Sequence, residues 1–431
     1  MNVLVMGAYG LIGCSIARQL RQDGHHVIGF GRDLATARRV LPGITWRQGD
    51  LRHMTDAANW APYLAGVEAV VNAAGALQDG PDDSVEAVHH LAVAALARAC
   101  APAAIRLVQI SAIGVSPDAD TAFFRSKARG DAAVRAAGAP YQIFRPGLVL
   151  APHSYGGTAL LRMLAAVPLI QPLALPEAKI QTVAADDVAR VVSAAIKGVL
   201  PDGLEADLVE DTPHTLRDLV GQMRHWLGTG AARREIVIPD RVTTLIAHVA
   251  DGLGRLGWRS PLRTTSIKVL ANGVTGKPAD LTPFGLAGMR PLSETLEAMP
   301  ARAEDRLFAR MALLAPVILT TLAMFWFVSG AIAILYVNTA AHVLESAGWA
   351  HGLAVASVLF WAVIDILVAA ALIYRPWAKA ACWAAVLVSL IYLLGASLVT
   401  PQLWLDPLGP LVKVLPGLVL AVVARITLET R

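Results

Sequence analysis

The sequence has few charged residues, few cysteines and no dense basic segment. Only 16% of its 431 residues are charged, and the three cysteines lie far apart without CxxC spacing. We therefore expect neither a disulfide framework nor a zinc site, and a reducing compartment for the part outside any membrane. Lys and Arg are scattered and the net charge is only +4, which argues against nucleic-acid binding. The N-terminus lacks the charged and long apolar segments of a signal peptide, so none is expected.

Apolar residues, by contrast, are in excess. They make up 55% of the chain, more than a soluble enzyme of this length needs. The excess gathers in the C-terminal third, in four nearly uncharged segments that are long enough to cross ~30 Å of hydrocarbon. We therefore predict an all-α transmembrane four-helix bundle over residues 306–431. Its predicted spans are 311–337, 352–374, 380–399 and 408–426.

Basic residues flank the predicted spans on one side of the membrane only. The other two loops carry Glu345 and Asp406 as their charges. Because Lys and Arg favour the cytoplasmic side, we expect both termini and the N-terminal region in the cytoplasm, at a bacterial inner membrane. The basic flanking residues are Arg302, Arg306, Arg310, Arg375, Lys379, Arg425 and Arg431.

Two charged residues fall inside the predicted spans. Asp365 lies near the middle of the second span and Lys413 lies at a similar depth in the fourth. A lone charge in lipid is expensive, so we predict a mutual pair. The alternatives are a polar headgroup site, for example for a quinone, and an outward-reaching Lys413.

Residues 1–147 alternate short Val- and Ile-rich runs with helical stretches. This βαβ alternation predicts an α/β Rossmann-type fold, a doubly wound parallel sheet whose ligands bind at the carboxyl ends of the strands. Residues 148–305 lose the regularity and are predicted to form a small α+β substrate lobe and linker. The predicted strands are Val3–Met6, His26–Phe30, Ile44–Gln48, Ala69–Asn72, Arg106–Ile110 and Tyr141–Phe144.

Two helices are predicted within the lobe. Val188–Val199 has amphipathic spacing, and Val242–Leu256 is followed by Trp258. For the second helix a packed position is favoured over contact with a membrane surface.

A glycine motif follows the first predicted strand. Residues 7–13 read GAYGLIG, a GxxGxxG pattern that opens the first helix. Glycines there permit a tight turn and let a pyrophosphate approach the backbone and the positive helix N-terminus. The motif predicts a nicotinamide dinucleotide.

The next strand ends indicate which dinucleotide is bound. The second strand ends at Gly31-Arg32, with no carboxylate for a ribose diol and with an arginine able to pair a 2′-phosphate. This favours NADP, with NAD possible; alternatively Arg32 only caps a surface turn. Asp50 closes the third strand, where it can accept from adenine, and Ala73-Ala74-Gly75 after the fourth lets the backbone face the cofactor.

Together these motifs resemble the atypical, NmrA-like branch of the short-chain dehydrogenase/reductase superfamily, which includes the nucleotide-binding accessory subunit of respiratory complex I. The C-terminal bundle resembles a DoxX-like membrane domain. The shared motifs are GAYGLIG, GRD at 31–33, GD at 49–50, NAAG at 72–75, Ser111-Ala112, SK at 126–127, RPG at 145–147 and DDVA at 186–189. The cofactor-binding residues that the resemblance implies are Gly7, Tyr9, Gly10, Leu11, Ile12, Gly13, Arg32, Asp50, Leu51, Ala73, Ala74, Gly75, Ser111, Lys127 and Pro146.

The resemblance breaks at the proton donor. Catalytic members carry a Tyr four residues before the Lys, but here Phe123 precedes Lys127 at that spacing, and a phenyl ring cannot transfer a proton. By resemblance, Lys127 holds the nicotinamide ribose and Ser111 lies near the nicotinamide. His153 and Tyr155 are substitute donors, or else ordinary loop residues.

A second pair of residues has no place in the motif. His89 and His90 have no Glu or Cys at ligand spacing, so surface or core positions are expected for them rather than a metal site.

The sequence thus predicts a membrane-anchored, NADP(H)-binding oxidoreductase for a small or lipophilic, for example quinone-like, substrate. The candidate catalytic residues are Ser111, Lys127 and Tyr155. The alternative is a non-catalytic dinucleotide sensor or assembly factor with membrane-protein partners, which Phe123 favours. A sugar-nucleotide epimerase or dehydratase is weakened by the same missing Tyr.

Overall fold

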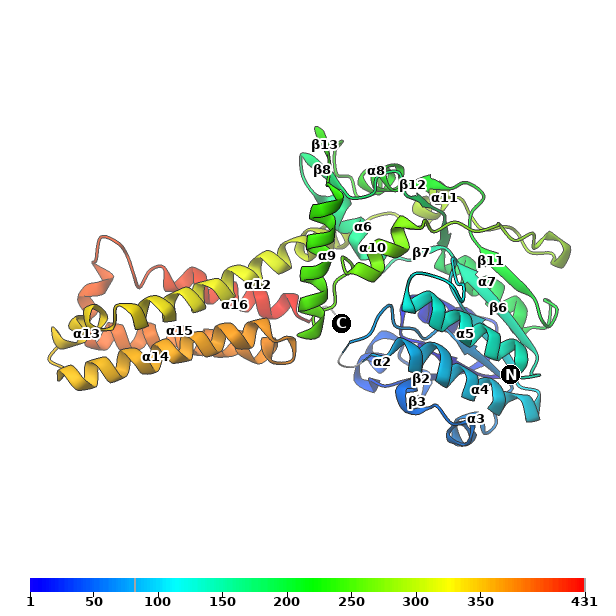
Figure 1. Cartoon of the computed structure of the whole chain (residues 1–431), viewed down its shortest axis with the longest axis horizontal. Coiled ribbons are helices and arrows are strands. Elements are labelled where there is room, and N and C mark those ends of the chain that lie inside the picture. Colours follow the sequence, from blue (N-terminus) through cyan, green and yellow to red (C-terminus); the bar gives the residue numbers. More distant parts are fainter. Residues whose placement is uncertain (81–82, 430–431) are drawn as a thin grey trace. The chain divides into compact units, whose positions relative to one another are not determined.

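The computed structural model describes residues 1–80 and 83–429, which divide into two units (Figure 1). The first unit holds residues 1–252 and 260–306, and the second holds residues 253–259 and 307–431. Arg431, one of the predicted basic flanks, lies outside the described residues.

The first unit is built on a seven-stranded sheet in the order β11-β6-β5-β4-β1-β2-β3. Every neighbouring pair in it is parallel. The predicted doubly wound parallel sheet is confirmed, with strand ends within two residues of those predicted, and β11 is an addition. The strands are β1 (Asn2–Met6), β2 (His26–Gly31), β3 (Thr45–Gln48), β4 (Ala69–Asn72), β5 (Arg106–Ile110), β6 (Tyr141–Pro146) and β11 (Glu205–Leu208).

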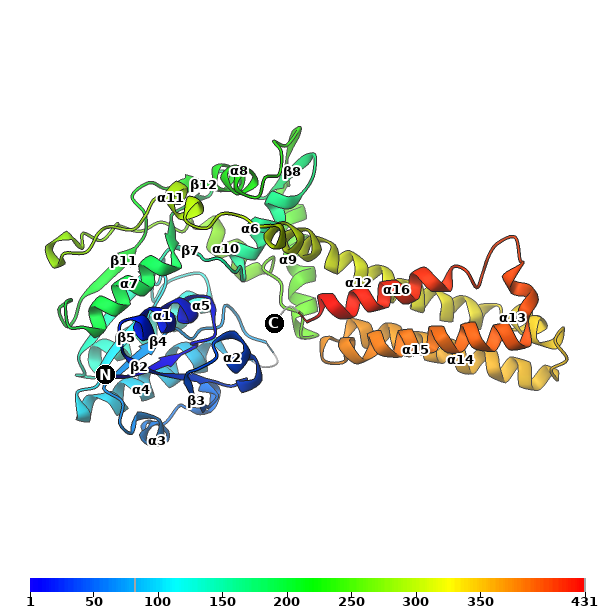
Figure 2. The same ribbon diagram turned by 180° about the vertical axis from the view of Figure 1, so that it is seen from behind.

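Helices cover both faces of this sheet (Figures 1 and 2). Alternate residues of β1 enter opposite cores, Val3 and Val5 on one face and Leu4 and Met6 on the other, as the two-residue period of a strand requires. Helices α1 (Leu11–Gln22) and α7 (Ala185–Ile196) pack in the first core. Helix α4 (Ala92–Cys100) packs in the second. Among the helices, α7 corresponds to the one predicted at Val188–Val199.

Three two-stranded sheets complete the first unit. They pair β7 (Leu148–Leu150) with β10 (Thr182–Ala184), β9 (Lys179–Ile180) with β12 (His214–Thr215), and β8 (Ile170–Leu173) with β13 (Arg234–Val237). The remaining α-helices of this unit are α2 (Leu34–Val40), α3 (Ala61–Leu64), α5 (Ala122–Ala136), α6 (Gly157–Ala166), α8 (Leu216–Trp226), α10 (Thr264–Ala271) and α11 (Leu292–Glu297).

The second unit is helical. Among the described residues, three helices are long and apolar enough to cross a membrane: α12 (Ala303–Leu335), α14 (His351–Ile373) and α15 (Arg375–Val399). Helix α13 (Val337–Glu345) links the first two. These helices coincide with the first three predicted spans, with boundaries that differ by up to eight residues.

The fourth predicted span, 408–426, is shorter than expected. Helix α16 runs over Val414–Thr427, 14 residues, about 21 Å at 1.5 Å per residue and less than a hydrocarbon core requires. Gly409 has φ +57°, in the left-handed region that ends regular helix, and Pro410 follows it. The loop therefore continues to Lys413, the residue directly before α16.

The predicted pair of Asp365 with Lys413 is wrong. Asp365, 3% exposed on α14, accepts hydrogen bonds from Ser329 Oγ of α12 at 3.0 Å and Tyr392 Oη of α15 at 2.6 Å. Hydroxyl donors from two neighbouring helices satisfy the carboxylate without a cation. Spacing along one helix does not show which hydroxyls face it across the bundle.

Candidate nucleotide site

The turn between β1 and α1 is closed by glycines that leave no room for side chains. Gly7 has φ +68°, and a Cβ there would lie 2.9 Å from the carbonyl oxygen of Ala73. At Gly13 a Cβ would lie 2.2 Å from the carbonyl oxygen of Gly7. Both distances are shorter than real contacts, so the turn, the β4 end and α1 pack at a spacing that only glycine allows.

The N-terminus of α1 is open for an anion. Gly10 precedes the helix in an extended conformation with no side-chain cap, and its N–H donates to Gly7 O at 2.8 Å. The N–H groups of Leu11, Ile12 and Gly13 open the first helical turn, where the backbone carries partial positive charge. This uncapped helix end beside a side-chain-free turn fits a pyrophosphate.

Tyr9, from the turn between β1 and α1, lies against the end of β2, and Arg32 directly follows that strand. A Cβ at Gly31 would lie 2.4 Å from the ring of Tyr9, so the ring can pack there only because residue 31 has no side chain. Arg32 Nη2 lies 2.8 Å from Asp83 Oδ1, and the following helix, α2, is capped by Asp33 rather than by Arg32. The guanidinium is thus oriented by a carboxylate and remains partly exposed, at 37%.

Asp50 at the end of β3 is already well partnered. It accepts from the backbone N–H of Arg52 at 3.0 Å and from the Arg52 guanidinium at 2.7 and 3.0 Å. Partial burial alone would raise the pKa of Asp50, but these hydrogen bonds hold it below its ordinary value. Asp50 therefore stays ionised and fixes the turn that begins at the buried Leu51.

At the end of β4, the side chain of Asn72 shapes the Ala73-Ala74-Gly75 turn. Its Oδ1 accepts from Ala74 N at 3.2 Å, and its Nδ2 donates to Gln109 at 2.8 Å. Ala73 N also donates to Met6 O, which ties this turn to β1. The predicted small residues of β1 and β4 are therefore neighbours in the structure.

His89 lies in the core behind this turn, on a π-helical turn at Ala87–Leu91, and is 2% exposed. Ala76 N–H donates to its Nε2 at 3.0 Å, so its proton is on Nδ1. Nδ1 donates to Ser126 Oγ at 3.0 Å, and Ser126 donates to the carbonyl of Phe123. Burial, aided by Lys127, holds the pKa of His89 well below its ordinary value, which agrees with this neutral tautomer.

Ser111 and Lys127 are brought together beside Asp131. Ser111 Oγ donates to Asp131 Oδ2 at 2.6 Å, and Lys127 Nζ donates to the carbonyl of Ile110 at 3.1 Å. Burial lowers the pKa of Lys127 to about 8, although Asp131 opposes the shift. Burial also raises the pKa of Asp131. An amine and a hydroxyl therefore lie at the carboxyl end of β5, where ligands of parallel sheets bind.

Phe123 takes the place where a proton-donating Tyr is expected. Its ring centroid lies 5.8 Å from Lys127 Nζ and 5.4 Å from the ring of His89. It packs between the amine and the neutral imidazole and carries no transferable proton.

The two substitute donors lie on the loop between β7 and α6. Tyr155 is 45% exposed, and its backbone is held by Thr158. Desolvation, with Arg18 and Arg162 nearby, lowers the pKa of His153, so this side chain is neutral at pH 7. The groups that hydrogen-bond to Ser111 and Lys127 come instead from Asp131 and Ile110.

Gly147 explains the turn after Pro146 at the end of β6. A Cβ at Gly147 would lie 2.5 Å from the carbonyl oxygen of Gln181. Arg145, on the other side of the buried Pro146, pairs with Glu205 of β11. The RPG segment thus joins the sheet to the chain that leads into the lobe.

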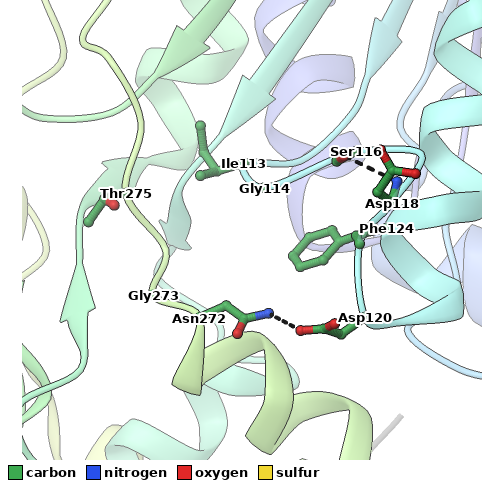
Figure 3. Close-up of a pocket in the computed structure, with 10 residues that line it drawn as sticks. Ile113, Gly114, Ser116, Asp118, Asp120, Phe124, Asn272, Gly273 and Thr275 are labelled. Atoms are coloured by element: carbon green, nitrogen blue, oxygen red, sulfur yellow. Dashed lines mark hydrogen bonds between the residues drawn. The ribbon is translucent and has the colours of Figure 1, made fainter.

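A cavity of about 240 Å³ opens where the chain leaves β5 (Figure 3). It begins at Ile113, two residues after Ser111, and Asn272 closes it by donating to Asp120 Oδ2 at 3.3 Å. Sequence reasoning missed these residues, since no motif marks the 272–275 segment that crosses from the lobe. The cavity is lined by Ile113, Gly114, Ser116, Asp118, Ala119, Asp120, Phe124, Asn272, Gly273 and Thr275.

Comparison with known families agrees with these two parts of the chain. Residues 7–198 match the NAD(P)H-binding family model, and residues 323–422 match the DoxX-like family. The ceramide reductase of Caulobacter vibrioides is 23% identical over 285 residues, which cover 65% of this chain and 86% of that protein.

Two solved structures share the fold of the first unit. The Bordetella bronchiseptica enzyme WbmH, in complex with NAD+, is 18% identical with a TM-score of 0.52, over 70% of this chain and 96% of its own. The Citrobacter sp. triphenylmethane reductase, complexed with NADP(H), is 15% identical with a TM-score of 0.52, over 69% of this chain and 100% of its own.

The chain therefore carries a Rossmann-type domain of the NAD(P)H-binding kind. It joins this domain to a DoxX-like, membrane-spanning helical domain.

Proposed function

We propose that this protein is a membrane-anchored, NADP(H)-dependent oxidoreductase that reduces a lipophilic carbonyl compound. The observation that carries the proposal is a cavity that begins at Ile113, two residues after Ser111, at the sheet edge that also carries Lys127 and the glycine turn. Three apolar helices on the same chain hold it at a bilayer, where a lipophilic substrate is concentrated. With Arg and Lys on the cytoplasmic side, the nucleotide site faces the cytoplasm of an inner membrane.

The residues present fit the dinucleotide along its length. The glycine turn and the α1 N-terminus receive the pyrophosphate, with Gly7, Gly10, Leu11, Ile12 and Gly13 as backbone contacts. Tyr9, Asp50 and Leu51 border the adenosine, and Ala73, Ala74, Gly75 and Pro146 line the path to the nicotinamide. Arg32 pairs the 2′-phosphate, which favours NADP over NAD.

Lys127 and Ser111 position the reacting groups. When bound, the dinucleotide supplies a hydride. Lys127, charged below about pH 8, binds the nicotinamide ribose. Because Ser111 donates its proton to Asp131, it has no proton left to donate to a substrate oxygen.

The proton needs another source. His153 is a poor one because it is already neutral at pH 7. We assign the role to Tyr155, with water as the alternative source. Hydride transfer itself requires only alignment over the nicotinamide.

One relative and the membrane domain support a lipophilic substrate class. A ceramide is a lipid, so the name of the Caulobacter reductase favours a long-chain lipid carrying a ketone. A quinone-like acceptor is the second candidate substrate, and oxidation of NADPH by a lipid ketone or by a soluble quinone distinguishes the two.

The test uses the detergent-purified full chain. NADPH and NADH binding is measured first, and then oxidation of bound NADPH with a long-chain lipid ketone, an aldehyde panel and a soluble quinone. We expect NADPH to bind more tightly and the lipid ketone to be reduced. Failure to bind either dinucleotide would overturn the proposal, and quinone reduction without ketone reduction would replace the substrate.

Two variants assign the proton donor. Tyr155→Phe is expected to lower turnover by about 100-fold with little change in NADPH affinity, the size of a general-acid contribution. Phe123→Tyr restores a hydroxyl beside Lys127 and is expected to raise turnover. An unchanged rate in Tyr155→Phe would assign the proton to water.

Phe123 supports a second candidate function, a dinucleotide-binding sensor or scaffold that does not turn over. This function predicts that NADPH binds tightly but is not oxidised by any acceptor, even in the Phe123→Tyr variant. A pull-down that recovers a membrane partner only in the presence of NADPH would then identify the protein that responds to the bound nucleotide.

A further inference from the structure

Helix α9 (Asp240–Arg255) has three distinct faces. One face consists of the small residues Thr243, Ala247 and Ala250, which are buried. At about 100° per residue, a second face of apolar side chains spans only about 100° of the helix, and all of them are 36 to 64% exposed. They are Val242, Leu245, Ile246, Val249 and Leu253, continued by Leu256 just beyond the helix.

The third face is polar and lies on the other side from the apolar one. It carries Arg241, Thr244, His248, Asp251 and Arg255. Asp251 pairs with Arg263 at 2.9 Å, so the polar face is held by the chain that follows. An exposed apolar face opposite a polar one is the pattern of a helix that lies in the plane of a membrane surface.

The C-terminal end of α9 is attached to the ends of two membrane-spanning helices. Trp258 Nε1 donates to the carbonyl of Ile373, the last residue of α14, at 2.6 Å. Arg375 N, at the start of α15, donates to Leu256 O at 3.0 Å. The Arg375 guanidinium also lies over the Trp258 ring, 5.4 Å from its centroid. The last turn of α9 is therefore at the level where α14 ends and α15 begins.

That level has the composition of a membrane–water interface. Tyr374 and Trp377 are 40% and 63% exposed, with ring centroids 5.5 Å apart. Trp258 contacts Arg375, the residue that follows Tyr374. Amphipathic aromatic rings gather at the headgroup level. Arg255, Arg259 and Lys379 add positive charge there, which suits anionic headgroups.

We propose that the apolar face of α9 is inserted in the lipid headgroup region, so that α9 is an interfacial helix at the membrane surface where α14 ends. We expect the apolar face to contact the bilayer rather than a protein, because the helix continues into residues that are hydrogen-bonded to the ends of α14 and α15. The proposal adds a second membrane contact to the three spanning helices and does not depend on any enzymatic activity.

The experiment places a spin label on each exposed face of α9 in the full chain, reconstituted into vesicles of phosphatidylcholine and phosphatidylglycerol. Val249→Cys reports the apolar face and Thr244→Cys, also exposed, is the matched control on the polar face. The native Cys14, Cys100 and Cys382 are fully buried, and burial raises the pKa of the Cys14 thiol, so background labelling is low. The unmodified chain, treated with the same reagent, measures that background.

We expect the label at residue 249 to be relaxed several-fold more by lipid-soluble oxygen than by a water-soluble nickel complex, and the label at residue 244 to show the reverse. The pair Leu253→Cys and Arg255→Cys repeats the measurement near the attached end. Equal nickel access at 249 and 244 would show a water-exposed face and overturn the proposal. Exclusion of both reagents at 249 would show a contact with another protein or a second copy, and would overturn it as well.

Discussion

The first unit, which is the nucleotide unit, and the second unit, which is the membrane unit, each bring two backbone segments together at a glycine. In the first, a Cβ at Gly13 would lie 2.2 Å from the carbonyl oxygen of Gly7. In the second, a Cβ at Gly330 of α12 would lie 2.6 Å from the carbonyl oxygen of Ala362 on α14. The first close approach shapes a turn for a ligand, whereas the second lets two apolar helices pack and places Ser329 near Asp365.

The difference shows what a sequence pattern carries. Around Gly13, three glycines at fixed spacing follow a strand and open a helix. This pattern predicts both where the turn lies and which kind of ligand it binds. Gly330 lies in an apolar stretch whose only pattern is its length, and length predicts a span but not its neighbours. Substitutions at these and nearby residues test whether geometry or side-chain chemistry dominates in each unit.

The largest effect is expected from Gly13→Val. A branched side chain at 2.2 Å from Gly7 O forces the turn away from α1, at a cost of about 3 kcal/mol. We expect the affinity for both NADPH and NADH to fall by about 100-fold, measured by titration calorimetry. Gly221→Ala, where nothing lies within 4 Å of an added Cβ, is the control and should bind normally. A folded Gly13→Val protein that binds within a few-fold of the parent would contradict the role of the turn.

A smaller effect, on stability rather than binding, is expected from Gly330→Val. The added side chain meets Ala362 O and Ile366, and overpacking of this kind costs about 2 kcal/mol. We expect a lower unfolding temperature in detergent, followed by circular dichroism, with dinucleotide affinity unchanged. Gly395→Val on α15, with open space around it, is the matched control. Equal unfolding temperatures for the two variants would show that α12 and α14 do not depend on this contact.

The sequence predicted the nucleotide unit more completely than the membrane unit, for a physical reason. Six of the seven strands of the sheet follow from Val- and Ile-rich runs, but Glu205–Leu208, which became β11, has no such run. The partner of Asp365 was mistaken because hydroxyls such as Tyr392 Oη are neutral and leave no mark in hydropathy. The cavity lined by Asn272 was missed because the segments that line it are distant in sequence.

Arg32→Ala tests side-chain chemistry at the nucleotide end. On the proposed pairing of Arg32 with the 2′-phosphate, removing this partly exposed guanidinium is expected to cost about 1.4 kcal/mol, a tenfold loss of NADPH affinity. NADH affinity should change little, because it lacks the 2′-phosphate. Arg39→Ala, a second exposed arginine at the end of α2, is the control. If NADPH and NADH affinities fall together, Arg32 does not select between them.

The smallest effect is expected from titration of Lys127. Burial lowers its pKa from 10.5 to about 8, so the amine loses its charge as the pH rises through 8. A hydrogen bond from a charged donor is worth about 1 kcal/mol more than one from a neutral donor, so NADPH affinity should fall about fivefold between pH 7 and 9. Lys127→Met should bind more weakly at pH 7 and should lack this pH dependence.

The same titration has the opposite effect on folding, which separates it from general alkaline damage. Between about pH 8 and 10.5 the unfolded chain keeps the Lys127 proton that the folded chain has released. Because the unfolded state then binds more protons, this group adds stability as the pH rises through that window. The parent chain should therefore gain unfolding free energy relative to Lys127→Met while it loses NADPH affinity. A parallel fall of both quantities would mean that Lys127 is not the titrating group.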